Sequence, residues 1–496
     1  MRTGKKALLT SVSKSFKHVS VFLLSILLSR YLSLDDYGSY LQVMLIATSV
    51  IYFSLMGIPS SIYYFVHRVK NKKQFIKRTI LMIHVLAIVS SSIILLMSGY
   101  ISEFLNNSQL VDVAFVFVMF ILFQIPIKIF EPLMISTDNI LGFVKINIFF
   151  NILFFFAVAI PLVYYSDIDY VYYSMISFFI LQYLVIHISI FREYVNLDNA
   201  DSDEYKDIEH CSIMNQLKYS LPIGASGAIA ELSRIVDKII VSSYFSPAQL
   251  AIYARGAMEI PMLSVVINSL ANILMPNFVK SYENNDVEKI LVYWHRSTVL
   301  IAFVVYPLMI LMIAIGDILI PMLFTEKFND SIIIFQIYTF SLLFRITAYD
   351  SIVRAVGRTN VLLRVTFISL VLNTLLTIIF IELFGIIGAP FATFISILVV
   401  RLEMLRVIKN LLNIKFVEVF PWMKLLKILL ISTLSLVFIV PVINLDMILI
   451  YKFFYSSILY AFVYLIFARY FSILDSNELN SLSSIVPKKL LSVLIK

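Results

Sequence analysis

The run Thr79–Ser98 is twenty residues long and contains no Asp, Glu, Lys or Arg. A helix of about 20 residues spans the hydrocarbon core of a membrane, which is about 30 Å thick. Comparable runs recur along the chain, so this run is not a single anchor on a soluble domain. Only 14% of the residues are charged and 60% are hydrophobic, whereas soluble chains carry about 25% charged residues. The sequence therefore predicts an all-α polytopic membrane protein.

The apolar runs predict about fourteen transmembrane helices, near residues 8–29, 38–66, 79–98, 109–133, 140–163, 169–191, 214–241, 248–277, 297–320, 331–353, 360–381, 387–405, 425–443 and 450–468. The second span is long and contains Gly57-Ile58-Pro59, which predicts a kink or a break in that helix. Cys211 is the only cysteine, so an intrachain disulfide and a cysteine-based metal site are excluded.

The basic residues follow a membrane topology. If the N-terminus is cytoplasmic, the cytoplasmic segments hold 24 Lys and Arg residues, six of them in segment 67–78. The outer loops hold three, which are Arg30, Lys327 and Lys452. Positive charge accumulates in cytoplasmic loops, so both termini are predicted to be cytoplasmic. This distribution explains the net charge of +8 without a nucleic-acid partner.

The segment Arg192–His210 carries seven acidic residues and divides the predicted spans. We interpret it as a solvated linker between two halves of the chain. The predicted organisation is a six-helix lobe over residues 1–191, an acidic cytoplasmic linker over 192–213, a second six-helix lobe over 214–410, and two additional helices with a cytoplasmic tail over 411–496.

An internal repeat relates the two lobes. Ser29–Gln42 reads SRYLSLDDYGSYLQ and Ser242–Arg255 reads SSYFSPAQLAIYAR. A shift of 213 residues aligns four identities, which are Ser29 with Ser242, Tyr31 with Tyr244, Ser33 with Ser246 and Tyr40 with Tyr253. An even number of spans in each lobe keeps both lobes in the same orientation. The repeat thus predicts a pseudo-two-fold axis along the membrane normal, with the substrate site between the lobes.

The segments LLSRYLSLDDYGSYLQ and SRIVDKIIVSSYFSPAQLAIYARGAMEIP (233–261) resemble polysaccharide biosynthesis membrane proteins. These are oligosaccharide flippases for O-antigen or capsule repeat units, within the superfamily that also holds multidrug and toxin extrusion pumps and lipid II flippases. The resemblance implies a bacterial inner-membrane protein with a V-shaped cavity and alternating access. Its substrate would be an undecaprenyl-diphosphate-linked oligosaccharide. The family's pattern in span seven maps onto Asp237 and Tyr253, and Lys238 directly after the Asp departs from it.

Ionisable residues inside a span are costly to insert and usually face protein or water. The candidates for substrate binding are Lys14 and Lys17 in span one, Glu231, Arg234, Asp237 and Lys238 in span seven, Arg255 and Glu259 in span eight, and Arg345 in span ten. Two structural alternatives stay open, which are lysines that extend to the inner interface and a self-neutralising charge network in span seven. We expect two histidines on apolar helices, His84 and His187, to have packing roles.

Spans one and seven together carry five basic residues, including Lys218, against two acidic ones. This excess favours an anionic substrate, because guanidinium groups offer paired donors to phosphate. The alternatives are a multidrug exporter driven by a cation, a lipid II flippase, and a membrane-embedded polysaccharide polymerase or ligase. The sequence predicts a transporter without a cofactor, and H⁺ or Na⁺ coupling is left open. The expected partners are the lipid-linked oligosaccharide, the bilayer, a polysaccharide polymerase and a chain-length regulator.

Overall fold

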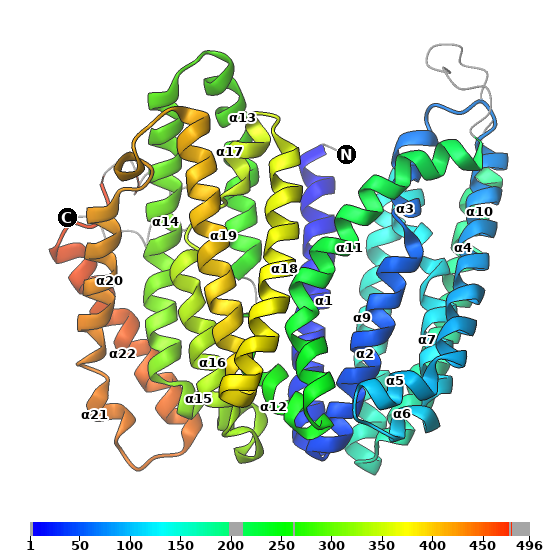
Figure 1. The fold of residues 1–496 in the computed structure, drawn as a ribbon, viewed down its shortest axis with the longest axis horizontal. Helices are drawn as coiled ribbons and strands as arrows, with labels where there is room; N and C mark the ends of the chain where they lie inside the picture. Colours follow the sequence, from blue (N-terminus) through cyan, green and yellow to red (C-terminus); the bar gives the residue numbers. More distant parts are fainter. Residues whose placement is uncertain (1–2, 198–211, 261–262, 476–477, 479–496) are drawn as a thin grey trace. The chain divides into compact units, whose positions relative to one another are not determined.

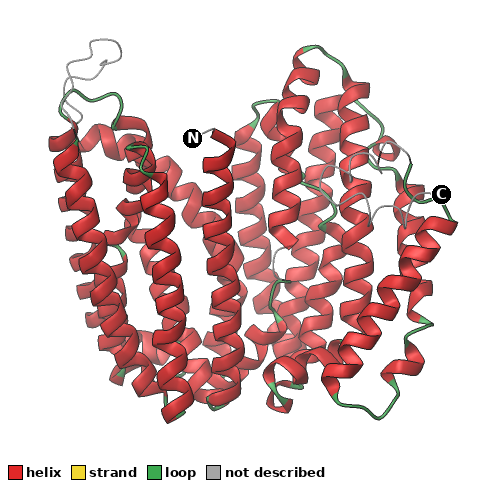
Figure 2. Cartoon of the chain, turned by 180° about the vertical axis from the view of Figure 1, so that it is seen from behind, coloured by secondary structure: helices red, strands yellow, loops and turns green. Residues whose placement is uncertain are grey.

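The computed structural model describes residues 3–197, 212–260, 263–475 and 478, which form helices and loops without a strand (Figure 2). Among these residues, eight helical stretches are long and apolar enough to cross a membrane. Each other predicted span corresponds to a more highly charged helix or to consecutive shorter helices. The prediction of an all-α polytopic membrane protein is confirmed. The chain folds into two compact units, Met1–Ala251 and Ile252–Lys496 (Figure 1).

Unit 1 is built from long helices that pack side by side. The chain forms α1 (Thr3–Tyr31), α2 (Leu34–Leu55), α3 (Ile58–Phe65), α4 (Lys72–Leu96), α5 (Ser98–Phe104), α6 (Gln109–Asp112), α7 (Ala114–Gln124), η1 (Pro126–Ile129), α8 (Phe130–Ser136), α9 (Ile140–Tyr165), α10 (Ile168–Asn196), α11 (Ile213–Tyr244) and the start of α12 (Pro247–Gly256). Within this unit, α1 and α10 pack along α9, and α4 packs along α7.

The predicted interruption at Gly57 is confirmed. Met56 and Gly57 both adopt left-handed backbone angles, with φ of 45° and 73°, and Pro59 lies in the first turn of α3. Helix α11 crosses this break at Gly224, where a Cβ atom would lie 2.2 Å from the carbonyl carbon of Met56. Glycine at position 224 therefore allows the backbone of α11 to pack directly on the break.

Buried amides fasten α11 to the other helices of unit 1. Near one end of α11, Gln216 donates to the hydroxyls of Ser61 and Thr79, each at 2.9 Å. Near the other end, Gln42 donates to Ser242 Oγ at 2.9 Å. Buried polar groups are stable in an apolar environment when they are hydrogen-bonded in this way. The compact units thus divide the chain after Ala251 and place α11 in unit 1. The six-plus-six division predicted from the repeat, with its boundary at 192–213, stays a prediction.

The helix ends support the repeat at one junction. Helix α1 ends at Tyr31 and α11 ends at Tyr244, while α2 begins at Leu34 and α12 begins at Pro247. Both pairs differ by the predicted shift. Each following helix is capped by a serine at the corresponding position: Ser33 Oγ accepts from Asp36 N at 3.1 Å, and Ser246 Oγ accepts from Gln249 N at 3.4 Å. The pseudo-two-fold axis itself stays a prediction.

Unit 2 contains the end of α12, α13 (Leu263–Glu283), α14 (Val287–Ala314), α15 (Gly316–Phe324), η3 (Glu326–Phe328), α16 (Ser331–Phe340), η4 (Ser341–Phe344), α17 (Asp350–Ala355), α18 (Thr359–Phe384), η5 (Gly385–Ile387), α19 (Gly388–Leu412), η6 (Phe416–Glu418), α20 (Trp422–Leu436), α21 (Val440–Ile443) and α22 (Leu449–Tyr470). Helices α18 and α19 form an antiparallel hairpin, and the largely buried α14 packs against α13, α16 and α20. The buried Trp294 of α14 stacks on Phe420 and donates to the carbonyl of Val419 at 2.9 Å.

Two predicted spans of unit 2 are interrupted. Span eight breaks after Gly256, and residues 257–260 are not helical. Span ten breaks between η4 and α17, where residues 345–349 leave the helix. Non-helical backbone at membrane depth is tolerated only where protein buries it or where it lines a cavity. These two breaks therefore point to the part of unit 2 where a site can form.

Candidate functional site

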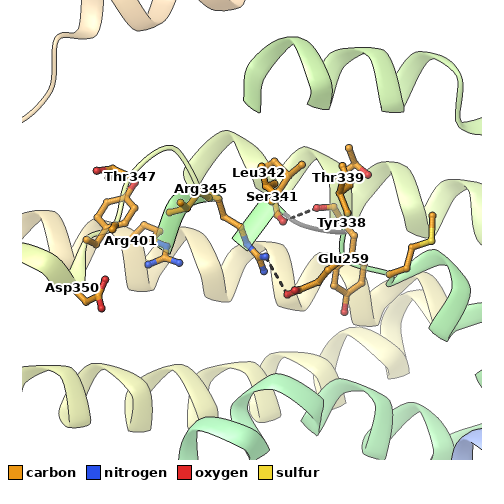
Figure 3. A pocket seen from close by; sticks show the side chains of 15 residues that line it. Glu259, Tyr338, Thr339, Ser341, Leu342, Arg345, Thr347, Asp350 and Arg401 are labelled. Atoms are coloured by element: carbon orange, nitrogen blue, oxygen red, sulfur yellow. Dashed lines mark hydrogen bonds and ion pairs between the residues drawn. The ribbon is translucent and has the colours of Figure 1, made fainter. Parts of the chain in front are cut away.

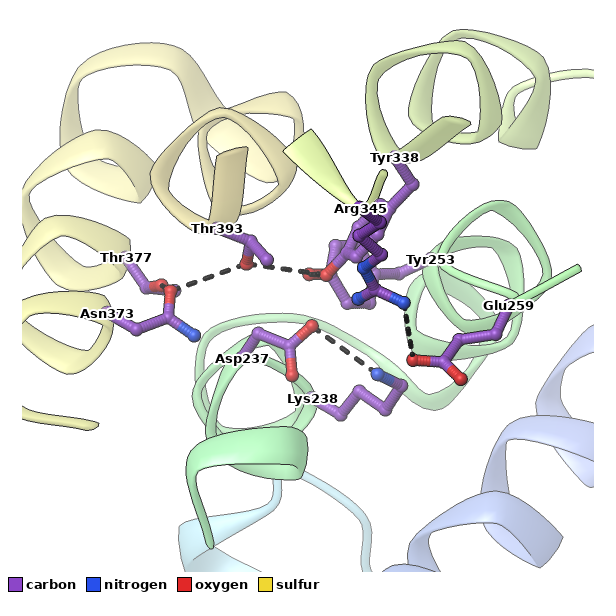
Figure 4. A network of polar contacts seen from close by, with 9 residues as sticks. All are labelled: Asp237, Lys238, Tyr253, Glu259, Tyr338, Arg345, Asn373, Thr377 and Thr393. Atoms are coloured by element: carbon purple, nitrogen blue, oxygen red, sulfur yellow. Dashed lines mark hydrogen bonds and ion pairs between the residues drawn. The ribbon is translucent and has the colours of Figure 1, made fainter. Parts of the chain in front are cut away.

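Helix α11 carries four of the predicted site residues as two neighbouring ion pairs. Arg234 donates to both carboxylate oxygens of Glu231, with Nη2–Oε1 at 2.6 Å and Nε–Oε2 at 3.2 Å. Lys238 Nζ lies 3.4 Å from Asp237 Oδ2 (Figure 4). The Glu231 side chain is 11% exposed, whereas that of Arg234 is 63% exposed. The pairing expected for a self-neutralising network is present, and the Arg234 side chain is still mostly exposed.

The position of Arg234 along α11 places it deep in a membrane-spanning helix. Ten residues separate it from the helix end at Tyr244, and ten residues of α-helix are about 15 Å long. That distance is about half of the roughly 30 Å hydrocarbon core. An exposed guanidinium at this depth requires water or a polar ligand rather than lipid. The aromatic side chain of Tyr52 on α2 lies within electrostatic range of the same pair.

Span one contributes a second charged cluster in unit 1. Lys17 of α1 lies within electrostatic range of Glu131 at the start of α8. Lys128 of η1 interacts with both of these residues, and Tyr63 of α3 lies near Glu131. The cluster thus combines two cations with one carboxylate. The backbone of Lys14 lies in α1, and its side chain lies outside the described part of the chain.

Arg255 and Glu259 lie four residues apart, and the sequence predicts that one helix carries both. In the structure they contact different neighbours. Arg255 is in the last turn of α12 and lies over the ring of Phe324, 5.4 Å from its centroid. Glu259 follows the break and pairs with Arg345, with Oε1 and Nη1 3.2 Å apart (Figure 4). The expectation of one continuous helix through both residues was wrong, because the helix ends at Gly256. Gly256 and Pro261, which flank the break in the sequence, are signals that could have predicted it.

Glu259 and Arg345 line a pocket of about 200 Å³ in unit 2 (Figure 3). Both helix breaks contribute to its walls, and the remaining lining comes from α13, α16, η4, α17 and α19. The polar lining residues are Glu259, Tyr338, Thr339, Ser341, Arg345, Thr347, Tyr349, Asp350 and Arg401. Discontinuous membrane helices of this kind form the substrate and ion sites of many transporters.

Arg401 is the functional candidate that the sequence analysis missed. It lies on α19 and stacks over the Tyr349 ring, 4.7 Å from the centroid. It is also within electrostatic range of Arg345 and Asp350. Arg401 falls inside the predicted span 387–405, where Glu403 is the only other charged residue in the sequence, so its position in a largely apolar run was the signal that could have found it.

A chain of hydroxyl and amide groups runs from the pocket wall into the helices of unit 2. Tyr338 shares a hydrogen bond of 2.7 Å with Tyr253 and donates to Thr393 at 3.4 Å. Thr393 and Thr377 each donate to Asn373 Oδ1, at 3.4 and 3.3 Å (Figure 4). These contacts join α12, α16, α19 and α18. They therefore hold Tyr338, which lines the pocket, in position.

The two histidines for which packing roles are expected, His84 and His187, pack against each other. Their rings lie 5.1 Å apart, and His84 Nε2 is 3.0 Å from the hydroxyl of Tyr183. Each Nδ1 lies within hydrogen-bond distance of a backbone carbonyl one turn earlier, at 2.8 Å for His84 and 2.9 Å for His187. Among the residues that the structure describes, no group of three or more His, Cys, Asp and Glu could hold a metal ion.

Solved transporters share this fold. The lipid II flippase MurJ in an inward closed conformation matches with a TM-score of 0.73 and 17% identity, over 94% of this chain and 98% of that chain. An inward-facing multidrug resistance transporter of the MATE family matches with a TM-score of 0.61 and 16% identity, over 80% of this chain and 95% of that chain. At these identities the likeness shows the fold alone.

Sequence comparison identifies the family. The capsular polysaccharide biosynthesis protein CapF of Staphylococcus aureus is 24% identical over 176 residues, which cover 34% of this chain and 43% of that protein. The match thus spans less than half of the length of that relative. The family described as "Polysaccharide biosynthesis protein" matches residues 27–333. Since this match covers well over half of the chain and agrees with the resemblance in the sequence, the protein belongs to the polysaccharide biosynthesis protein family, and its fold is that of a flippase-type membrane transporter.

Proposed function

We propose that this protein moves an undecaprenyl-diphosphate-linked oligosaccharide repeat unit from the inner to the outer leaflet of a bacterial inner membrane, by alternating access. It is a transporter and not an enzyme, and both of its termini are cytoplasmic. Its partners are the lipid-linked oligosaccharide and the surrounding lipid, together with the polymerase and the chain-length regulator that act on the delivered repeat units.

The observation that carries this proposal is the exposed guanidinium of Arg234 in the middle of α11. Glu231 orients the group through two hydrogen bonds, and the Arg234 side chain is 63% exposed. A guanidinium is well suited to a diphosphate because its donors match pairs of phosphate oxygens. The Lys17 cluster of the same unit adds two cations and one carboxylate among the described side chains.

These charges argue against a multidrug exporter, which needs an apolar cavity with an acidic group to hold a cationic drug. They do not separate an oligosaccharide carrier from a lipid II flippase, because both substrates carry a diphosphate. The family assignment and the capsular relative favour the oligosaccharide.

The test is complementation of a host that lacks its own oligosaccharide flippase, with surface polysaccharide measured relative to protein abundance. Arg234→Ala should reduce surface polysaccharide most, and Arg234→Lys should reduce it partly, since Lys keeps the charge and loses the paired geometry. Membrane abundance should hold in Arg234→Lys.

The matched control is Lys289→Ala. Lys289 is 61% exposed and forms an ion pair with Asp286 at the same i, i+3 spacing, near the start of α14. We expect this variant to complement fully. Full complementation by Arg234→Ala at normal abundance would overturn the proposal and leave the charges of α11 as a structural network.

A further inference from the structure

The pocket of unit 2 contains buried polar atoms that the protein does not satisfy. Thr347 is 5% exposed, and its hydroxyl has no hydrogen-bond partner among the described residues. The same holds for the buried Nε of Arg401. Both residues line the pocket. A buried polar group without a partner is costly, so these two atoms mark places where a ligand would supply the missing hydrogen bonds.

Arg401 is the basic residue of the pocket that forms no ion pair with a described carboxylate, so a bound anion could neutralise its charge. Glu259 pairs with Arg345 at 3.2 Å, and Asp350 pairs with Arg354 at 2.7 Å. Within the described ranges, Arg401 has no carboxylate oxygen within 4 Å, and its stacking partner is the neutral ring of Tyr349. The guanidinium groups of Arg345 and Arg401 lie on the same side of the pocket (Figure 3). An anion between them would be attracted by both.

The size and the remaining lining specify the kind of anion. The cavity of about 200 Å³ is smaller than the roughly 300–1,000 Å³ of pockets that hold drug-sized ligands, so it suits one sugar residue and not a whole oligosaccharide. The hydroxyls of Thr339, Ser341 and Thr347 lie in its wall and suit the hydroxyl groups of a sugar. One unneutralised guanidinium balances one carboxylate, whereas a diphosphate carries more negative charge.

We propose that this pocket recognises a single carboxylate-bearing sugar residue of the transported oligosaccharide, and that Arg401 binds the carboxylate. The sugar hydroxyls are bound by Thr347 and its neighbours. This inference rests on the proposed function, because it names the class of oligosaccharide that the protein carries. The diphosphate is assigned to unit 1 and the acidic sugar to unit 2.

The direct test is ligand binding to the purified full-length protein in detergent, followed as the shift of the thermal unfolding midpoint. A ligand that binds the folded state raises this midpoint, and at equal concentration a tighter ligand raises it more. The probes are glucuronate, glucose and inorganic diphosphate, compared at equal ionic strength. We expect glucuronate to raise the midpoint, with an apparent affinity about ten-fold above that of glucose. Stabilisation by glucose equal to that by glucuronate would overturn the role of the carboxylate.

Variants locate the binding in this pocket. Arg401→Gln should weaken glucuronate binding about ten-fold, and Arg406→Gln should not change it, since Arg406 lies on the same helix and is 74% exposed outside the pocket. If Arg401→Gln fails to fold, Thr347→Val provides the second test, because it removes the buried hydroxyl and keeps the shape of the side chain. Unchanged glucuronate binding in Thr347→Val and Arg401→Lys would then overturn the proposal. A third outcome would also overturn the proposal: diphosphate stabilises the wild-type protein but not Arg401→Gln, and glucuronate stabilises neither. The pocket would then be a phosphate site.

A cellular readout separates this inference from the proposed function. In hosts that make an acidic or a neutral repeat unit, Arg401→Gln should reduce export of the acidic unit more than that of the neutral unit. Equal reduction of both would overturn the sugar site and leave the transport function intact. Failure of the wild-type protein to export either repeat unit would instead overturn the proposed function.

Discussion

The two units present their membrane-embedded charges in different ways. In unit 1, Arg234 projects from α11, a helix that continues from Ile213 to Tyr244 without a break. In unit 2, Glu259 and Arg345 stand at breaks in two helices, where the backbone itself lines a pocket. A continuous helix can expose a cation to a mobile group such as a lipid diphosphate. A pocket built from broken helices encloses its ligand and is suited to recognise a particular sugar.

Helix α11 packs closely on the backbone between α2 and α3 at Gly224, and a bulky side chain there should have the largest effect. In Gly224→Leu, the new Cβ would collide with the backbone at Met56, which cannot move away as a flexible side chain can. We expect loss of nearly all folded protein, measured as the monodisperse fraction in size-exclusion chromatography. The control is Gly227→Ala on the same helix, since a Cβ at Gly227 has no atom within 4 Å. Comparable losses in both variants would show that the contact with the break is unimportant.

The helix breaks of unit 2 should matter more for transport than its continuous helices. Two ion pairs have the same N–O distance of 3.2 Å: Arg345–Glu259 at the pocket and Arg364–Glu403 between α18 and α19. Arg345→Ala removes a cation from the pocket and leaves Glu259 without its partner, so we expect surface polysaccharide to fall about ten-fold or more. Arg364→Ala should change it less than about two-fold, because neither Arg364 nor Glu403 lines the pocket. Equal effects of the two substitutions would show that residues at the helix breaks are no more important for transport than residues on continuous helices.

Sequence patterns predicted the helices better than the breaks. The break at Gly57 was predictable because glycine and proline stand together there and both disfavour a continuous helix. The break at residues 345–349 contains neither residue, so it is set by tertiary packing and the pocket that it lines. Arg234 stood out in the sequence because several charges surround it. Arg401 did not, because its importance depends on Arg345 and Tyr349, which are more than fifty residues away in the chain.

The smallest effect is expected from Trp294, which supports unit 2 next to the pocket. Trp294→Phe removes the hydrogen bond to the buried carbonyl of Val419, and leaving such a group unsatisfied costs about 1–3 kcal/mol. We expect a lower Tm in detergent and less than a two-fold change in transport at equal abundance. Trp422→Phe is the control, since Trp422 is partly exposed and lies at the start of α20. A loss of transport without a loss of stability in Trp294→Phe would show that this residue acts on the pocket itself.

Reconstitution into lipid vesicles measures whether the protein moves a lipid-linked oligosaccharide, as we propose, and whether this movement depends on the diphosphate. Purified wild-type protein and Arg234→Ala would be placed in separate vesicles that contain a fluorescent undecaprenyl-diphosphate-linked oligosaccharide, and its appearance in the opposite leaflet would be timed. We expect rapid movement with the wild-type protein, about ten-fold slower movement with Arg234→Ala, and none of a matched polyprenyl glycoside that lacks phosphate. Wild-type rates no faster than in protein-free vesicles, or equal rates for the two lipids, would contradict the proposal.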